Sequence, residues 1–520
     1  MGSHPPQKVN QLIISSIGDA SFLNPILAQD SASSEINSFV FNGLIKYDRN
    51  LQNFVGELAE SWEVKEGPEP VIAFHLRKGV LWHDGKEFTA HDVKFTYDKI
   101  MDEKTNTVRR SSYELVKEAK VLDPYTFKVT YKQPFSPGLE SWGMGIIPKH
   151  LLEKEDINTT SFNRRPIGTG PFRFIEWVTD EKIVVEANPR YFEGRPHLDR
   201  IVYRIIPETA LSEMEVLTRG IDYSGVFPQQ FRRMSQVSFL KTYSQPSLGY
   251  TYIGYNLKNP LFQDRRVRLA LTHAINREEI VQYVLYGLGT VATGPFPNHL
   301  WYCNPHVKPI PYDPQKAREL LAEAGWKDKN KDGILVKDGK PFKFTLITNS
   351  GNDTRRDVGV LVQRQLYEVG IDVTLELYEW SVFLKDFINA KHFDACILGW
   401  GLSVDPDAYE IWHSSQIEKG FNTISYRNPV VDRLWEEGRR EYDLEKRKQI
   451  YWRIHELIAE DQPYTFLYVP LGISALQKKF WLMEKDPSGH EVLRPIQMEK
   501  AGLMYDLIKW TIPKQIVLER

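Results

Sequence analysis

The chain has 520 residues, too many for one hydrophobic core, and a domain size of about 150 residues predicts roughly two to four domains. Hydrophobic residues make up 42% and charged residues 26%, a composition that excludes a disordered chain, and no run of about 18 apolar residues is present to span a bilayer. A formal net charge of −2 argues against a nucleic-acid partner, because no basic field is available for phosphates.

The first predicted elements follow a short polar lead. MGSHPPQ is typical of an expression tag and a disordered lead, so any export signal of the natural protein is expected to have been removed. A strand is predicted over Leu12–Ser16, before the loop GDASFLNP. Ser33 or Ser34 is expected to cap a helix that runs to about Leu44.

A strand pair and a capped helix come next. Residues 71–88 alternate as two strands around the turn at Asp84-Gly85. Thr89, with Asp92 three residues later, predicts the start of a helix, and two short strands are expected on either side of Asp123-Pro124.

Two β-α-β units predict that at least part of the sheet is parallel. The first contains a strand over Arg200–Ile206, a helix that Gly220 ends, and a strand over Ile221–Tyr223. The second places the helix DVGVLVQRQLYEVG between strands over Phe342–Thr348 and Val373–Tyr378.

The remaining pattern is mainly helical. A tyrosine-rich strand over Leu248–Asn256 precedes the helices DRRVRLALTHAI and NREEIVQYVLYG, and Asp313 caps a helix that ends at Gly325. A long amphipathic helical region is predicted over Trp435–Glu460, and a last apolar strand over Tyr464–Pro470.

Basic clusters and cysteines indicate no site of their own. Arg439-Arg440 and Lys446–Lys448 alternate with acidic residues and are expected on a solvated helix face. Cys303 and Cys396 are too few for a disulfide framework or a zinc site. Cys396 lies in an apolar run and is expected in the core, while a bridge between the two is left open.

Motifs of catalysis and metal binding are incomplete. Gly287–Ala292 matches the dinucleotide pattern but follows a helix, and His455 lacks the second histidine of a zinc protease. Asp328–Gly333 imitates a calcium loop, but Gly339 stands where a carboxylate is required, so a polar turn before a strand from Ile334 is expected. No metal, cofactor or nucleophile set is predicted.

The stretch over Asp394–Trp412, DACILGWGLSVDPDAYEIW, is the first candidate for a binding site. Its apolar run Ala395–Leu398 predicts a buried strand, and Gly399-Trp400-Gly401 breaks it. Trp400 would then lie near the carboxyl edge of a sheet, where open α/β sheets bind ligands. A core tryptophan beside an ordinary turn is the alternative.

Several segments together resemble the solute-binding proteins of ABC importers, in the peptide/nickel-binding class. They span most of the chain: NGLIKYDRN, LAESWEV, FHLRKGVLWHDGKEFTAHDVKFTYDKI, GTGPFRF, YNLKNPLFQDRRVRLALTHAINREEI, YDPQKARELLAEAGW, GWGLSVDPDAYEIWHSS and YRNPVVDRLW. The resemblance implies an α/β, two-lobed periplasmic-binding-protein (Venus-flytrap) fold with an inserted subdomain. Lobe I would comprise residues 8–48, 168–254 and 471–520, the insertion 49–167, and lobe II 255–470.

The resemblance also implies where a ligand binds between the lobes. Ser21 and Phe22 are expected opposite Trp400, Gly401 and Asp405. Further candidates are Tyr250, Tyr252 and Trp412, each with packing in the protein as the alternative, and Arg355, for which an exposed arginine at a helix start is the alternative.

Two positions bear on the ends of a peptide ligand. Arg355 lines up with the region where dipeptide receptors place an arginine on the ligand carboxylate, and a guanidinium reads a carboxylate bidentately. The aspartate that holds the ligand amine, four positions before Pro406, is Leu402 here. Asp405 is the nearest carboxylate and is expected either to replace it or only to shape the turn.

The predicted function is that of a non-catalytic receptor. It would capture oligopeptides outside the cytoplasm, as a periplasmic or lipid-anchored monomer, and deliver them to the permease subunits of an ABC importer. A receptor for a nickel or other metal chelate, held by Trp400, Arg355 or His413, is the first alternative. An oligosaccharide receptor is the second, and a hydrolase is a remote third.

Overall fold

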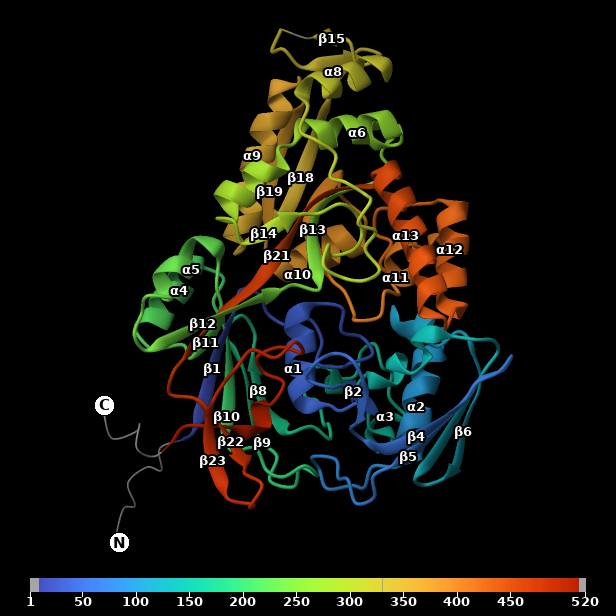
Figure 1. Cartoon of the computed structure of the whole chain (residues 1–520), viewed down its shortest axis with the longest axis vertical. Coiled ribbons are helices and arrows are strands. Elements are labelled where there is room, and N and C mark those ends of the chain that lie inside the picture. Colours follow the sequence, from blue (N-terminus) through green and yellow to red (C-terminus); the bar gives the residue numbers. More distant parts are fainter. Residues whose placement is uncertain (1–8, 330, 514–520) are drawn as a thin grey trace. The chain divides into compact units, whose positions relative to one another are not determined.

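The structure, a computed structural model, describes residues 9–329 and 331–513. The opening MGSHPPQ lies outside the described residues, and so does Asn330 of the run that imitates a calcium loop. The chain packs into two compact units (Figure 1). The first unit runs to Val226 and includes Arg232–Tyr243 and the chain from Ser474; the second comprises Phe227–Phe231 and Ser244–Ile473.

A mixed sheet forms the centre of the first unit. Its strands follow the order β11-β1-β10-β9-β8. β1 runs parallel to β10 and β11, which confirms the predicted parallel pairing, while β9 is antiparallel to both β10 and β8. The elements are β1 (Gln11–Ser16), α1 (Ser31–Val40), β8 (Phe172–Val178), β9 (Lys182–Ala187), β10 (Arg200–Ile205), α4 (Thr209–Leu217) and β11 (Tyr223–Gly225).

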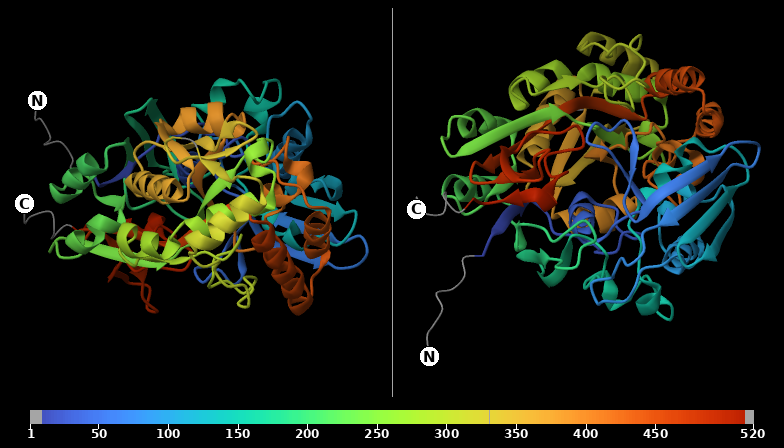
Figure 2. Two further views of the ribbon diagram at one scale, coloured as in Figure 1. Left: turned by 90° about the horizontal axis from the view of Figure 1, so that it is seen from above. Right: turned by 60° about the horizontal axis from the view of Figure 1, so that its bottom comes forward.

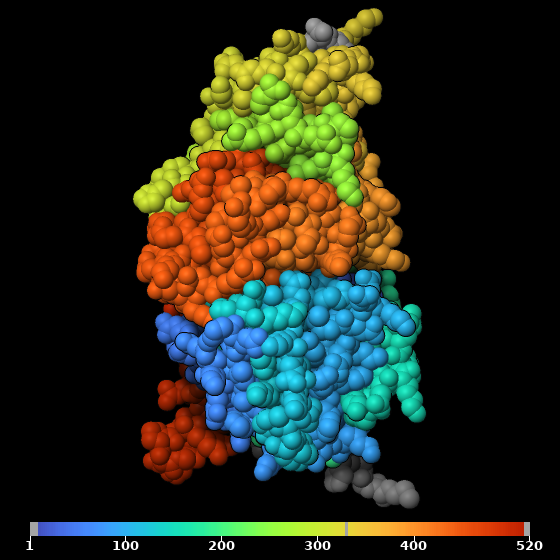
Figure 3. Space-filling view, turned by 90° about the vertical axis from the view of Figure 1, so that its right-hand side faces the viewer, coloured from blue at the N-terminus to red at the C-terminus, as the bar shows by residue number. Residues whose placement is uncertain are grey.

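An antiparallel sheet in the order β4-β5-β7-β6 lies in the part predicted as an insertion (Figure 2, right). Helix α2 packs against β6 and β7, and the outer surface of these segments is blue and cyan in Figure 3. The elements are β2 (Ile45–Tyr47), β3 (Phe54–Gly56), β4 (Ala59–Lys65), β5 (Val71–Leu76), α2 (Ala90–Met101), β6 (Val116–Asp123), β7 (Thr126–Tyr131) and α3 (Lys149–Leu152). The C-terminal strands β22 (Trp481–Lys485), β23 (Glu491–Pro495) and β24 (Trp510–Thr511) form a separate small sheet.

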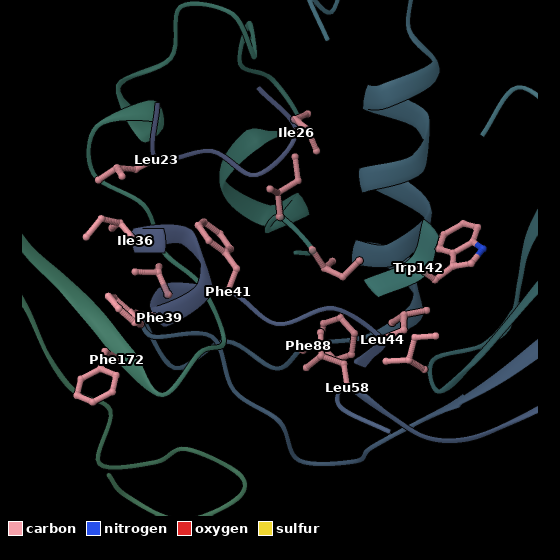
Figure 4. Close-up of a cluster of buried hydrophobic side chains, with 14 of the residues drawn as sticks. Leu23, Ile26, Ile36, Phe39, Phe41, Leu44, Leu58, Phe88, Trp142 and Phe172 are labelled. Atoms are coloured by element: carbon pink, nitrogen blue, oxygen red, sulfur yellow. The ribbon is translucent and has the colours of Figure 1, made fainter. Parts of the chain in front are cut away.

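One apolar core joins these sheets and helices within the first unit. Figure 4 shows part of it, where Phe39 and Phe41 from the end of α1 lie near Phe172 and the aliphatic side chains of the neighbouring loops. The rings of Phe39 and Phe172 meet edge to face with centroids 6.3 Å apart. Trp142 fills the same core beside the antiparallel sheet.

The second unit is built on the strand order β19-β18-β20-β13-β21. β18 is parallel to β19 and to β20, which confirms the second β-α-β unit, and β13 is antiparallel to β20 and β21. Strands and helices of this unit are β13 (Gly249–Tyr255), α6 (Arg265–Ala274), α7 (Arg277–Glu279), β14 (Gly289–Val291), α8 (Pro314–Glu323), β15 (Asp328–Lys329), β16 (Leu335–Lys337), β17 (Lys340–Pro341), β18 (Lys343–Asn349), α9 (Asp353–Glu368), β19 (Asp372–Tyr378), α10 (Trp380–Val382), β20 (Ala395–Gly401), α11 (Tyr409–Trp412), α12 (Pro429–Arg440) and α13 (Leu444–Asp461).

Three elements belong to both units along the chain: α5 (Pro228–Met234), β12 (Leu240–Pro246) and β21 (Tyr464–Gln477). The lobe boundaries implied by the resemblance stay a prediction. No helix in the part of the chain that the structure describes is both long and apolar enough to cross a membrane.

Of the three helix starts that were predicted from capping residues, two are confirmed and one is wrong. Thr89 and Asp92 form the predicted capping box of α2, and Asp313 caps α8. Helix α1, however, begins at Ser31, because the Asp30 side chain accepts a hydrogen bond from the backbone N–H of Ser33 at 2.8 Å. It ends at Val40 because the next residue is extended.

Two other expectations were wrong in detail. The turn at Asp84-Gly85 closes only a single bridge between Leu81 and Glu87, and β5 pairs instead with β4 and β7. The helical region over Trp435–Glu460 is two helices, α12 and α13, because Asp443 starts a new helix by accepting from the N–H of Lys446.

Candidate functional site

A large pocket lies within the first unit. It has a volume of about 1100 Å³ and is lined by the loop after β1, the segment before β8, and β8 itself. We call it the first-unit pocket, and its lining residues are Ser21, Phe22, Asn158–Ser161, Asn163–Ile167 and Phe174–Val178. Ser21 and Phe22, predicted from the sequence as ligand contacts, therefore border a cavity.

Hydrogen bonds fix the loop that carries Ser21 and Phe22. The Ser33 hydroxyl accepts from the backbone N–H groups of Ser21 and Phe22 at 2.8 and 3.1 Å, and it donates to Asp30 at 2.7 Å. Farther along the loop, the Asn24 side chain donates to that of Asn163 at 2.9 Å. The loop is thereby held to α1 and to the segment before β8, while Phe22 stays exposed.

Another part of the pocket lining is organised around Trp177 of β8. Its indole N–H lies 3.0 Å from both carboxylate oxygens of Asp19, which also accepts from the backbone N–H of Asp180. The Arg164 guanidinium lies over the Trp177 ring, 3.7 Å from its centroid, and donates to the Thr179 hydroxyl at 2.7 Å. Sequence reasoning missed these residues, because no local motif links positions 19, 164 and 177.

In the second unit, Trp400 lies within strand β20 and not beyond its end. It pairs with Tyr250 of β13, and its partly buried ring stacks on Tyr252 at 6.2 Å between centroids. Its indole N–H donates to the Tyr464 hydroxyl at 3.3 Å. Gly401, next along the strand, is exposed, and Leu402 is half-buried.

Three other predicted ligand contacts lie in the interior of the second unit. Tyr250, Tyr252 and Trp412 are almost completely buried in the aromatic cluster around Tyr464 and Phe466. Tyr252 stacks on Tyr464 with centroids 3.8 Å apart. Each of the three fills the packing role that sequence analysis gave as the alternative, and their contact with a ligand stays a prediction.

Asp405 is engaged by an arginine of α13. Arg447 donates to both Asp405 carboxylate oxygens at 2.7 Å, and the side chains of Arg447 and Asp405 are only 8% and 14% exposed. This pair raises the pKa of Arg447, against the effect of its burial. A ligand amine at Asp405 would have to compete with Arg447. The ion pair favours the expectation that Asp405 shapes the turn, and its contact with a ligand stays a prediction.

Arg439 forms a second ion pair beneath the same turn. Its guanidinium lies 3.1 Å from Asp407 and stacks over the Tyr409 ring. Burial raises the pKa of Asp407 to about 6. The expectation that Arg439 and Arg447 lie on a solvated face was therefore wrong. Both side chains are on the buried sides of their helices. The sequence concealed this because their neighbours along the chain are exposed charged residues.

Arg355 differs from these arginines because it contacts no carboxylate among the described residues. It lies near the start of α9, is partly buried, and donates to the Asn349 side chain at 2.8 Å. Burial lowers its pKa. A Cβ on Gly399 would lie 3.3 Å from the guanidinium, so a glycine at this point of β20 allows Arg355 to approach the strand beside Trp400.

The cysteines are separate, buried thiols, which answers the question of a bridge. Cys303 lies 3.7 Å from the His455 ring nitrogen. Burial raises the pKa of Cys303 to about 11 and lowers that of His455 to about 4, so both groups are neutral at pH 7. A neutral thiol is a poor nucleophile.

Comparison with known proteins identifies the family of the chain. The family model of bacterial extracellular solute-binding proteins, family 5, matches residues 53–421. The oligopeptide-binding protein AppA of Bacillus subtilis (strain 168) is 41% identical over 523 residues, which cover 98% of this chain and 93% of AppA.

Solved structures agree with this result. That of B. subtilis AppA in complex with a nonapeptide matches with a TM-score of 0.91 and 38% identity, over 98% of this chain and 100% of the other. NikZ from Campylobacter jejuni, in complex with Ni(L-His), matches with a TM-score of 0.85 and 28% identity, over 96% and 99%. The α/β, two-lobed periplasmic-binding-protein fold implied by the sequence is thus confirmed. The chain belongs to the bacterial extracellular solute-binding proteins of family 5.

Proposed function

We propose that this protein is an oligopeptide receptor that delivers its ligand to the permease subunits of an ABC importer. The observation that carries the proposal is the full-length similarity to AppA of Bacillus subtilis, whose structure was solved with a nonapeptide. The receptor acts outside the cytoplasm as a monomer and returns its ligand chemically unchanged.

Two regions supply the proposed ligand contacts. Ser21 and Phe22 border the first-unit pocket, on a loop that hydrogen bonds hold in place. In the second unit, Arg355 is a partly buried cation without a carboxylate partner among the described residues, and it lies beside the strand that carries Trp400. A free peptide carboxylate supplies the missing partner, and bidentate pairing is the geometry that guanidinium favours.

A metal chelate is the second candidate ligand. It is favoured by the similarity to NikZ from C. jejuni, solved with Ni(L-His) at 28% identity. Among the described residues, no group of three or more His, Cys, Asp or Glu side chains could hold a metal ion. A chelate would accordingly be recognised through its organic part.

Native mass spectrometry of protein purified from a peptide-rich medium tests the proposal. An oligopeptide receptor is expected to carry a heterogeneous set of peptide masses that disappears on denaturation. One discrete nickel-containing mass, or a glycan, would contradict peptide binding. Recovery of an added nonapeptide intact after long incubation is expected as well, and its cleavage would identify a hydrolase.

A further inference from the structure

The charges that line the first-unit pocket are unbalanced. Arg164 and Arg165 both line it and both are exposed, and neither guanidinium forms an ion pair with a carboxylate of the described chain. Glu176 is the acidic residue of the lining, and Lys182 neutralises it at 2.8 Å. The nearby Asp19 is buried and already accepts from Trp177 and Asp180. Positive charge at this wall is therefore available to a ligand.

Apolar side chains stand beside the two arginines. Phe22, Ile175 and Val178 line the pocket and are 39%, 43% and 37% exposed. Large apolar side chains that gather at a cavity mark a binding surface more often than a random patch does. The occupant that suits this lining has an anionic group next to an apolar group.

The cationic part of the pocket, around Arg164, is held in a fixed geometry. Trp177 is anchored through its N–H to Asp19, and the Arg164 guanidinium lies over the Trp177 ring and donates a hydrogen bond to Thr179. Stacking and the hydroxyl contact restrict the rotamers of a side chain that is otherwise mobile. A preorganised guanidinium loses less entropy when it binds a carboxylate.

We propose that the first-unit pocket is a subsite for an acidic side chain, Asp or Glu, that is next to an aliphatic or aromatic residue in the bound peptide. Arg164 and Arg165 bind the carboxylate, and Phe22, Ile175 and Val178 contact the apolar neighbour. This inference rests on the proposed function as a peptide receptor, and it specifies which peptides the receptor prefers.

Calorimetric titration with matched nonapeptides tests the subsite. Each probe places Asp-Leu at one position of a neutral nonapeptide, and its partner carries Asn-Leu at the same position. The Asp probe is expected to bind about fivefold more tightly than its Asn partner for at least one position, because the pair is partly exposed to water. This preference is expected to shrink as salt rises from roughly 0.05 to 0.5 M.

Variants locate the preference in the pocket. The double variant Arg164→Gln/Arg165→Gln is expected to bind the Asp probe no more tightly than its Asn partner. Arg232→Gln is the matched control, because Arg232 is an exposed arginine of the same unit that does not line the pocket. It is expected to keep the preference, and melting temperatures verify that each variant is folded.

The outcomes separate the two proposals. Tight binding of nonapeptides without any Asp preference, or with a preference that the double variant retains, overturns the subsite alone. Binding of no nonapeptide at all overturns the proposed function and the subsite with it.

Discussion

At the scale of single residues, buried ion pairs decide what the turn after Trp400 is able to do. Both carboxylate oxygens of Asp405 accept hydrogen bonds from Arg447, and Asp407 forms an ion pair with Arg439. The four charged groups lie close together in a mostly buried position. Ion pairs with Arg439 of α12 and Arg447 of α13 therefore hold the turn in place. These ion pairs hold the loop in its shape through contacts within the protein itself.

Replacing Asp405 tests this role. Asp405→Ala leaves Arg447 buried without its partner, so the free energy of unfolding is expected to fall by about 3 kcal/mol in urea denaturation. The control Glu445→Ala breaks the exposed pair with Lys448 and is expected to cost about 0.5 kcal/mol or less. An Asp405→Ala variant as stable as the control, but with weakened peptide binding, would make Asp405 a ligand contact.

A second residue-scale prediction concerns Glu35 of α1. Burial raises its pKa from 4.5 to about 7, although a hydrogen bond with Tyr203 opposes the shift. Because the folded state binds the proton more tightly, this group stabilises the fold below pH 4.5 and that contribution is lost as the pH rises to about 7.

Glu35→Gln removes this dependence. The variant is expected to match the unchanged protein near pH 4 and to exceed its free energy of unfolding by roughly 2 kcal/mol near pH 8, as measured by urea denaturation across pH. Glu60→Gln, at an exposed position of the same unit, serves as control. Equal pH profiles for Glu35→Gln and the unchanged protein would show that Glu35 titrates normally.

At the scale of elements, the GTGPF motif before β8 allows two backbones to meet. A Cβ on Gly168 would lie 1.8 Å from the carbonyl oxygen of Val40, the last residue of α1, and Gly170 donates its N–H to that oxygen at 2.8 Å. The contact joins α1 to the segment that lines the first-unit pocket. The glycine is needed for space, not for an unusual backbone angle.

Gly168→Ala is therefore expected to lower the free energy of unfolding by about 3 kcal/mol. Thermal denaturation followed by circular dichroism measures the loss. Gly225→Ala, where no atom lies within 4 Å of the added Cβ, is expected to be nearly neutral. Equal melting temperatures for the two variants would contradict the close contact.

Element boundaries were predictable where the signal is local. The capping box at Thr89 and the cap at Asp313 lie within three residues of the groups they bind, so the sequence contains the whole interaction. The start of α1 was missed because Asp30 competes with two serines for the cap, and one of these serines, Ser33, instead binds the loop at Ser21.

At the scale of the whole molecule, ligand binding is expected to appear as added stability. A nonapeptide at about 100 times its Kd raises the free energy of unfolding by about 2.7 kcal/mol, so the melting temperature increases. The C-terminal amide of the same peptide is expected to stabilise less, because it offers Arg355 no carboxylate. Scanning fluorimetry compares the two peptides.

The role of Arg355 follows from the same comparison. Arg355→Gln is expected to abolish the difference between acid and amide, whereas Arg356→Gln, on the exposed side of α9, keeps it. A difference that survives in Arg355→Gln would place the carboxylate elsewhere. Stabilisation by neither peptide would contradict peptide binding.

The sequence by itself determined the α/β class, the two β-α-β units, the caps of α2 and α8 and the family, because each depends on local patterns or on ordered motifs along the chain. It also directed attention to Ser21 and Phe22, which border a pocket. Only the structure showed that Tyr250, Tyr252 and Trp412 are buried. It also showed that Asp405 forms an ion pair with Arg447 and that Arg164 stacks on Trp177. These facts join residues that are distant along the chain, and the direction of each side chain is set by packing that no local pattern contains.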